Sequence, residues 1–355
     1  MSKRTPTRPH QPIARWLGAS ALSLALSGSA LALSVGDLQT AVNAAHAKYK
    51  SLNAGATADY IPELAKVPAD LFGVAIVTLD GKVYTAGDVD YAFSIQSISK
   101  PFASALMMEQ QGVEAVRAKI GVEPTGMPFN SILAIDLQGR SPRNPLVNAG
   151  AIATISAIEA KNETERWNKV LDWMSDMAGE KLTMLDDVYK SEAATNWNNR
   201  AIGWMLHNRG KMYSEPMEAV DVYTKECSIG VTAKQLAMMG ATLANGGKNV
   251  KTGKQVMKGE NVPELLAVMM MAGFYDESGL WAYTAGLPAK TGVGGGIVAV
   301  VPGKMAIAAF SPRVNDAGNS VRAMNAIEYI SRELGLSIFG ANAGEAVLAK
   351  ITASQ

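Results

Sequence analysis

Apolar residues follow a strand pattern near both ends of this chain. Residues 72–79 (FGVAIVTL) form an apolar run, and Asp80-Gly81 behind it is a strong hairpin signal before KVYTAG. Towards the C-terminus, Pro302-Gly303-Lys304 separates two further apolar runs, Ile297–Val301 and Met305–Phe310. The pattern therefore predicts one β-hairpin at each end.

Between these hairpins, apolar residues recur at helical spacing. The segment Asp37–Lys50 already shows this spacing ahead of the first hairpin, with Leu38, Val42, Ala45 and Tyr49 on one face. Similar patterns predict helices around residues 99–111, 150–160, 166–178, 197–207, 216–225, 232–245 and 262–272, and over Val321–Leu334. If the terminal strands join one sheet, the fold class is α/β, with an antiparallel sheet from the N- and C-terminal strands flanked by helices. A helical lobe is then inserted between about residues 103 and 280, and a site is expected in the cleft between the two parts.

The N-terminus reads as a targeting segment. Residues 1–15 carry Lys3, Arg4, Arg8 and Arg15 with no acidic residue, and residues 16–33 form an apolar run ending near Ala30-Leu31-Ala32. This order of basic, apolar and small residues predicts a signal peptide, residues 1–32, that is cleaved from a domain of residues 33–355. The alternative is an uncleaved membrane anchor, for which the serines and glycines make a weak span. We expect a periplasmic or secreted protein with no membrane contact once the signal is removed.

Composition narrows the function further. The formal net charge is +1, which offers no field for nucleic acid or an anionic membrane, so we expect a small-molecule protein. Cys227 is the only cysteine in the sequence, which rules out an intramolecular disulfide. Neither His46 nor His207 lies in a cluster with ligand spacing, so no metal and no cofactor are expected. An enzyme with this sequence needs a general base other than histidine.

The stretch FSIQSISKPF, residues 93–102, offers such a base. On a helix, Lys100 shares a face with Ser97 but not with Ser99, so Ser97 alone fits S-x-x-K. A lysine base must be neutral, which needs a pKa decrease of roughly 3 units, and burial beside apolar neighbours acts in that direction. Ser94 and Ser99 are expected to bond to local backbone or to begin the helix.

A second motif lies near the C-terminal hairpin. Lys290-Thr291-Gly292 matches K-T-G, which in penicillin-recognising enzymes lies on a strand that faces the nucleophile. The Ser-Asp-Asn tripeptide of those enzymes does not occur between the two motifs. The glycines that follow, Gly294–Gly296, precede a strand rather than a helix, so they do not indicate a nucleotide site.

Over nearly the whole mature chain, the sequence resembles the serine-dependent glutaminases, which have a β-lactamase-like and penicillin-binding-protein-like fold. The matching blocks come in the family's order: ADYIPELA (58–65), GDVDYAFSIQSISKPF (87–102), EPTGMPFNS (123–131), NPLVNAGAI (144–152), SEAATNWNNRAIGWML (191–206), CSIGVTAKQLAMMGATLANGG (227–247), MMAGFYDESGLWAY (270–283), GLPAKTGVGGGI (286–297) and SPRVNDAGNSV (311–321). The resemblance implies hydrolysis of L-glutamine, a homodimer or homotetramer, and the following roles. Ser97 matches the nucleophile and Lys100 its base. Tyr275 and Tyr60 match tyrosines near the nucleophile. The substrate-binding positions are Ser97, Asn148, Glu192, Asn199, Tyr223, Tyr275 and Val293. Asn198 departs from the family's arginine, which leaves the local support of Asn199 open.

The chemistry of glutamine fits these residue types. A carboxylate (Glu192) suits the α-ammonium group, and the amides suit the α-carboxylate. Three alternatives stay open: a periplasmic penicillin-binding protein or β-lactamase, a non-catalytic amino-acid-binding protein, and a cysteine amidohydrolase using Cys227.

Overall fold

The computed structural model describes residues 35–139 and 141–340, all within one compact unit, Ala32–Gln355. The predicted signal peptide lies outside the described residues. Five antiparallel strands form the main sheet in the order β2-β1-β8-β7-β6. Their bounds are β1 (Gly73–Thr78), β2 (Val83–Gly87), β6 (Ala289–Thr291), β7 (Gly296–Val301) and β8 (Met305–Phe310). The pairing of β1 with β8 joins the N- and C-terminal strands in one sheet, which confirms the predicted fold class.

The central strands are buried on both faces. In β1, Val74 and Ile76 pack into one apolar cluster, while Ala75 and Val77 pack into another on the opposite face. Because side chains alternate along a strand, a continuous apolar run of this kind needs cover on both faces.

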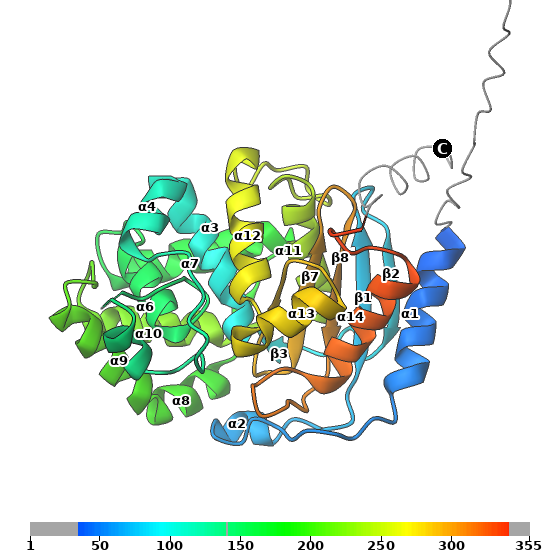
Figure 1. Cartoon of the computed structure of the whole chain (residues 1–355), viewed down its shortest axis with the longest axis horizontal. Coiled ribbons are helices and arrows are strands. Elements are labelled where there is room, and N and C mark those ends of the chain that lie inside the picture. Colours follow the sequence, from blue (N-terminus) through cyan, green and yellow to red (C-terminus); the bar gives the residue numbers. More distant parts are fainter. Residues whose placement is uncertain (1–34, 140, 341–355) are drawn as a thin grey trace, which may run out of the picture. The chain divides into compact units, whose positions relative to one another are not determined.

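Helices from distant parts of the chain supply that cover (Figure 1). On one face, α1 (Val35–Tyr49) and α14 (Val321–Glu333) lie against each other and against the strands. On the other, α11 (Ala233–Ala244) packs across β1, β7 and β8. A Cβ atom at Gly240 would come within 2.7 Å of both Ala306 and Val298, so glycine allows α11 to approach the sheet.

The remaining helices include the predicted insertion. Their bounds are α2 (Pro62–Ala65), α3 (Ser99–Gln111), α4 (Val113–Lys119), α5 (Leu133–Leu137), α6 (Asn148–Ala157), α7 (Glu163–Ala178), α8 (Asp186–Thr195), α9 (Trp197–Asn208), α10 (Pro216–Cys227), α12 (Val262–Ala272) and α13 (Ser278–Thr284), with short 3₁₀ turns η1 (Gln96–Ile98), η2 (Gly259–Asn261) and η3 (Tyr275–Glu277). A second sheet, β3-β5-β4, is built from the short strands β3 (Phe93–Ser94), β4 (Thr183–Met184) and β5 (Ile229–Val231). The sequence pattern did not predict this sheet or α8, because segments of two or three residues and a polar helix carry little periodicity.

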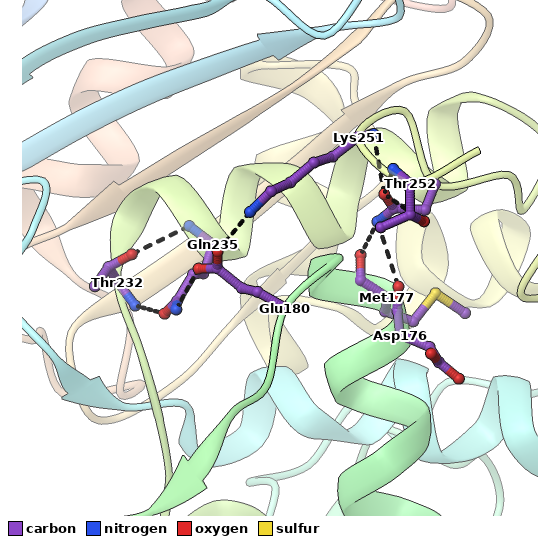
Figure 2. A network of polar contacts seen from close by, with 8 residues as sticks. Asp176, Met177, Glu180, Thr232, Gln235, Lys251 and Thr252 are labelled. Atoms are coloured by element: carbon purple, nitrogen blue, oxygen red, sulfur yellow. Dashed lines mark hydrogen bonds and ion pairs between the residues drawn. The ribbon is translucent and has the colours of Figure 1, made fainter. Parts of the chain in front are cut away.

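A polar network joins the end of α7 to the start of α11 (Figure 2). Glu180 accepts hydrogen bonds from Gln235 Nε2 and Lys251 Nζ, both at 2.6 Å, and Gln235 also closes a capping box with Thr232. Beside it, Asn249 is fully buried. Its Nδ2 donates to the Met177 carbonyl at 2.9 Å, and its Oδ1 accepts from the Thr252 backbone N–H at 2.9 Å.

Replacing Asn249 therefore tests how this network fixes α7. We expect Asn249→Ala to lower the free energy of unfolding by about 2–4 kcal/mol, because it leaves buried backbone groups without partners. Asn43→Ala, at an exposed position on α1, is the control and should change stability by less than about 0.5 kcal/mol. Urea denaturation measures both, and equal stabilities of the two variants would contradict the assignment.

Candidate active site

Ser97 and Lys100 lie where the short sheet meets α3. The chain leaves β3 at Ser94, passes through the 3₁₀ turn η1 that holds Ser97, and continues directly into α3 with Lys100 in its first turn. Pro101 is tolerated there because first-turn residues have no intrahelical acceptor for an N–H. Ser99 begins α3 as expected. The local backbone hydrogen bond expected of Ser94 is not formed, and its buried hydroxyl has no partner among the described residues.

The K-T-G sequence lies against this turn. Lys290 and Thr291 are on the edge strand β6, and a Cβ atom at Gly292 would come within 2.9 Å of the Ile95 carbonyl oxygen. A Cβ atom at Gly294 would come still closer to the backbone, at 2.5 Å from the Ser94 carbonyl oxygen. Val293, between these two glycines, is therefore held beside Ser97. The backbone N–H groups of Ser97 and Val293 donate to no other group within residues 35–139 and 141–340.

The Lys100 amine is fully buried and is held by a chain of amides. Its Nζ donates to Asn148 Oδ1 at 2.6 Å, and Asn148 Nδ2 donates to Asn199 Oδ1 at 2.9 Å. Both bonds fix the orientation of the Asn148 amide, and Asn199 Nδ2 has no acceptor among the residues that the structure describes. Asn198, the departure from the family pattern, donates to the Asn130 carbonyl oxygen at 2.8 Å, so the turn before Asn199 has support of its own.

Burial lowers the pKa of Lys100 to about 8, although nearby Cys227, Glu226 and Glu192 oppose the decrease. The dominant cause is loss of water around the ammonium group, which disfavours its charged form. The pKa of Lys290 is lowered further by burial and by the charge of Lys100. Both buried amines lie near the Tyr275 ring, Lys100 Nζ at 5.8 Å and Lys290 Nζ at 4.0 Å, and Lys100 is the one at helical spacing from Ser97.

Glu192 on α8 is buried and accepts a hydrogen bond from Gln96 Nε2 at 3.0 Å. Burial raises its pKa to about 7, while Gln96 and Lys100 act in the opposite direction. Gln96 itself has φ of 50°, a left-handed conformation that is costly for a residue with a side chain. Gln96 directly precedes Ser97, and in this conformation its side chain reaches Glu192.

Tyr275 is the second residue of the site with a left-handed backbone, at φ 57°. Its ring packs 4.7 Å from that of Phe129 and 4.0 Å from Lys290 Nζ. Burial raises the pKa of the Tyr275 phenol, and the neighbouring Ser97 lowers it. The Tyr275 hydroxyl faces Ser97 without a hydrogen bond of normal geometry. Tyr60, in contrast, is 56% exposed.

A cavity collects most of the predicted site residues. Its walls are Tyr60, Ile61, Gln96, Ser97, Phe129, Asn130, Asn148, Glu192, Thr195, Asn196, Asn198, Asn199, Tyr223 and Val293. Lys100 and Tyr275 do not line the cavity, but both contact residues that do. Sequence reasoning gave no role to Gln96 or Phe129. Phe129 lies in the matched block EPTGMPFNS, whereas nothing in the sequence signals the backbone strain at Gln96.

Within residues 35–139 and 141–340, no group of three or more His, Cys, Asp or Glu side chains could hold a metal ion. In the same ranges, no helix is long and apolar enough to cross a membrane.

Fold and cavity together define a protein of the β-lactamase-like class with a serine and a buried lysine at its centre. The glutaminase family model matches residues 55–339, so the chain belongs to the glutaminase family. It is 54% identical over 307 residues to a glutaminase of Bordetella avium (strain 197N), which covers 86% of this chain and 98% of that protein. To glutaminase 1 of Escherichia coli (strain K12) it is 52% identical over 307 residues, covering 86% and 99%.

Solved structures agree with the sequence relatives. A structure described as a probable glutaminase superposes with a TM-score of 0.86 at 52% identity, covering 87% of this chain and 100% of that one. The structure of Mglu in its glutamate form has a TM-score of 0.82 at 34% identity, covering 86% and 71%. The predicted family and fold are confirmed, and the protein is an enzyme of this family.

The raised pKa of Glu192 predicts a pH-dependent cost in stability. Between its ordinary pKa of 4.5 and about 7, the unfolded chain has released the Glu192 proton while the folded chain retains it. The Glu192 contribution to stability therefore falls as pH rises through this window, by about 3 kcal/mol. We expect Glu192→Gln to gain stability relative to wild type by that amount from pH 5 to pH 8, measured by urea denaturation.

Glu180→Gln is the matched control, because Lys251 and Gln235 lower the pKa of Glu180. This carboxylate stabilises the fold above its unfolded pKa, so its variant should instead lose stability relative to wild type as pH rises. A Glu192→Gln difference that is constant with pH would contradict the assignment.

Proposed function

We propose that this protein hydrolyses L-glutamine to L-glutamate and ammonia, with Ser97 as nucleophile and Lys100 as its base. The observation that carries the proposal is the cavity, which Ser97 lines together with the buried carboxyl group of Glu192 and the Asn199 amide. Membership of the glutaminase family and the glutamate form of the related Mglu support the same substrate class.

The polar groups of the cavity match the two charges of the amino-acid head. Glu192 would pair with the α-ammonium group, and this new cation would lower the pKa of Glu192 and favour its ionised form. The Asn199 amide and the Tyr223 hydroxyl would donate to the α-carboxylate, with Asn148 fixed between Asn199 and Lys100. The side-chain carboxamide of the substrate would then extend to Ser97.

In the first half of the reaction, Ser97 Oγ attacks the carboxamide carbon as Lys100 Nζ accepts its proton. The oxyanion would lie between the Ser97 and Val293 backbone N–H groups, which have no competing acceptor in the described part of the chain. The C–N bond breaks, and ammonia leaves with the proton that Lys100 accepted. A γ-glutamyl ester on Ser97 remains.

In the second half, water attacks the ester and L-glutamate leaves. The water proton returns to Ser97, with Tyr275 or Tyr60 as the relay. The Tyr275 hydroxyl faces Ser97 from inside the protein, whereas Tyr60 lies at the exposed edge of the cavity. These positions favour Tyr275 as the group that passes the proton to Ser97, and Tyr60 as the group that exchanges protons with solvent.

Ser97→Ala tests the nucleophile. We expect it to reduce kcat for ammonia release from L-glutamine by about 10⁴-fold or more, because Ser104, the other hydroxyl at helical spacing from Lys100, does not line the cavity. Glutamine should still bind in calorimetry. Ser104→Ala, which removes a buried hydroxyl without a partner on the same helix, is the control and should keep near wild-type activity.

The same assays separate the alternatives. Full activity in Ser97→Ala would refute the mechanism. If Cys227→Ala loses activity while Ser97→Ala keeps it, the protein is a cysteine amidohydrolase. Hydrolysis of a chromogenic cephalosporin without ammonia release would indicate a penicillin-binding protein or β-lactamase. Heat on titration without product would indicate a binding protein.

Export and assembly are also proposed. The leader-like residues 1–32 support delivery to the periplasm or the medium. N-terminal sequencing should therefore find a mature protein that begins near Leu33. Family resemblance supports a dimer or tetramer. Light scattering of the purified protein measures that state, and a monomer would contradict it.

A further inference from the structure

Glu226 is a buried carboxyl group that the proposed reaction does not use. It lies in the last turn of α10 and is fully buried, and neither of its side-chain oxygens has a hydrogen-bond partner in the described part of the chain. Buried carboxyl groups without partners are rare because desolvation is expensive. This one therefore needs an explanation.

Its position connects it to the lysine base. Tyr223, Glu226 and Cys227 share one face of α10 at helical spacing, and Tyr223 lines the cavity with its ring 5.7 Å from Lys100 Nζ. Across from this face, α3 presents Ser99 and Lys100. The Ser99 hydroxyl is buried beside Glu226 and, like it, has no partner of normal geometry.

Other charged groups near α10 are directed elsewhere. On α7, Glu163 pairs with Lys225 at 2.7 Å, and Arg166 interacts with Glu218 and Glu163. On α8, Glu192 bonds to Gln96, and on β6, Lys290 Nζ donates to the Thr291 carbonyl oxygen at 2.6 Å. On α9, Arg200 bonds to Asn196 Oδ1 at 2.9 Å, and α6 carries no charged side chain. Lys100 is thus the cation that acts on Glu226.

We propose that Glu226 is a positioning residue that acts through Lys100: its carboxylate retains the ammonium form of Lys100 and so sets the pH above which this amine can accept the Ser97 proton. The two groups affect each other in opposite directions. Burial raises the pKa of Glu226 to about 8 and Lys100 lowers it, whereas the charge of Glu226 raises the pKa of Lys100. Both titrate in one pH range, so their protons are coupled.

The inference rests on the proposed glutaminase activity, and the pH profile of kcat/KM for L-glutamine tests it. Wild-type kcat/KM should rise with pH as Lys100 loses its proton. In Glu226→Gln, the negative charge is missing, so the acid limb should move to lower pH by about one unit. The kcat on the plateau should stay within about threefold of wild type, because Glu226 does not touch the reacting atoms.

Two further variants complete the experiment. Glu226→Leu removes the carboxyl group and puts no amide in its place. It should move the acid limb by the same amount, which keeps the test usable if one variant fails to fold. Glu218→Gln, on the same helix, should leave the limb unmoved. An acid limb that coincides with wild type in both Glu226 variants would overturn the proposal, and so would a plateau kcat lower by about 100-fold in a folded variant.

A second measurement does not depend on catalysis. The infrared difference spectrum between wild type and Glu226→Gln should contain a carboxylic-acid C=O stretching band at pH 6, and this band should be absent at pH 10. A band that persists at pH 10 would overturn the proposal, since a carboxyl group that stays protonated carries no charge to act on Lys100. If wild type releases no ammonia, the proposed function fails while the infrared result still decides whether Glu226 carries a titrating proton.

Discussion

Removal of the Lys100 ammonium from water is the constraint on which the rest of the site depends. A charged amine in a fully buried position loses its hydration, and the protein lowers this cost by lowering the pKa of the amine and by placing one acceptor and two carboxyl groups near it. These groups come from three different helices: Asn148 on α6 accepts its hydrogen bond, while Glu192 on α8 and Glu226 on α10 raise its pKa. The packing of these helices around α3 is therefore also an electrostatic arrangement, and a change in one of them alters the charge on the base.

The fold holds the serine in place by two close approaches. On one side, β3 pairs with β5, which fixes the chain immediately before η1. On the other, glycines at 292 and 294 let the backbone after β6 touch residues 94–98, where any side chain would collide with backbone atoms. Left-handed conformations occur at Gln96, directly before Ser97, and at Tyr275, whose hydroxyl faces Ser97. Strain of this kind persists only where the surroundings determine the backbone, as they do between these two contacts.

Much of this arrangement could be predicted from the sequence, and the part that could not has a physical cause. Long apolar runs such as Met305–Phe310 and long amphipathic helices such as α14 have a strong period, so four of the five strands of the main sheet and the helices that cover it were predicted to within about two residues. Ser97 and Lys100 are linked by helical geometry alone, which is local. The positions of Glu192 and Asn199 came instead from family resemblance, because polar residues on α8 and α9 carry no periodic signal. Gln96 and Glu226 were missed for a related reason: backbone strain and the burial of a charge are properties of tertiary contacts.

The presence of buried carboxyl groups around Lys100 follows from the same constraint. A lysine whose pKa is lowered by burial alone would be neutral, but it would also stand in an apolar site unable to hold the charged head of an amino acid. Carboxyl groups near the amine reverse part of its pKa decrease, while burial raises their own pKa values, to about 7 for Glu192 and about 8 for Glu226. Each group is thus held near its point of ionisation, where a single added charge changes the protonation of the others. Under the proposed mechanism, the α-ammonium group of a bound substrate is such a charge. It would ionise Glu192, whose carboxylate would in turn act on Lys100, so substrate binding and the state of the base are coupled through one buried carboxylate.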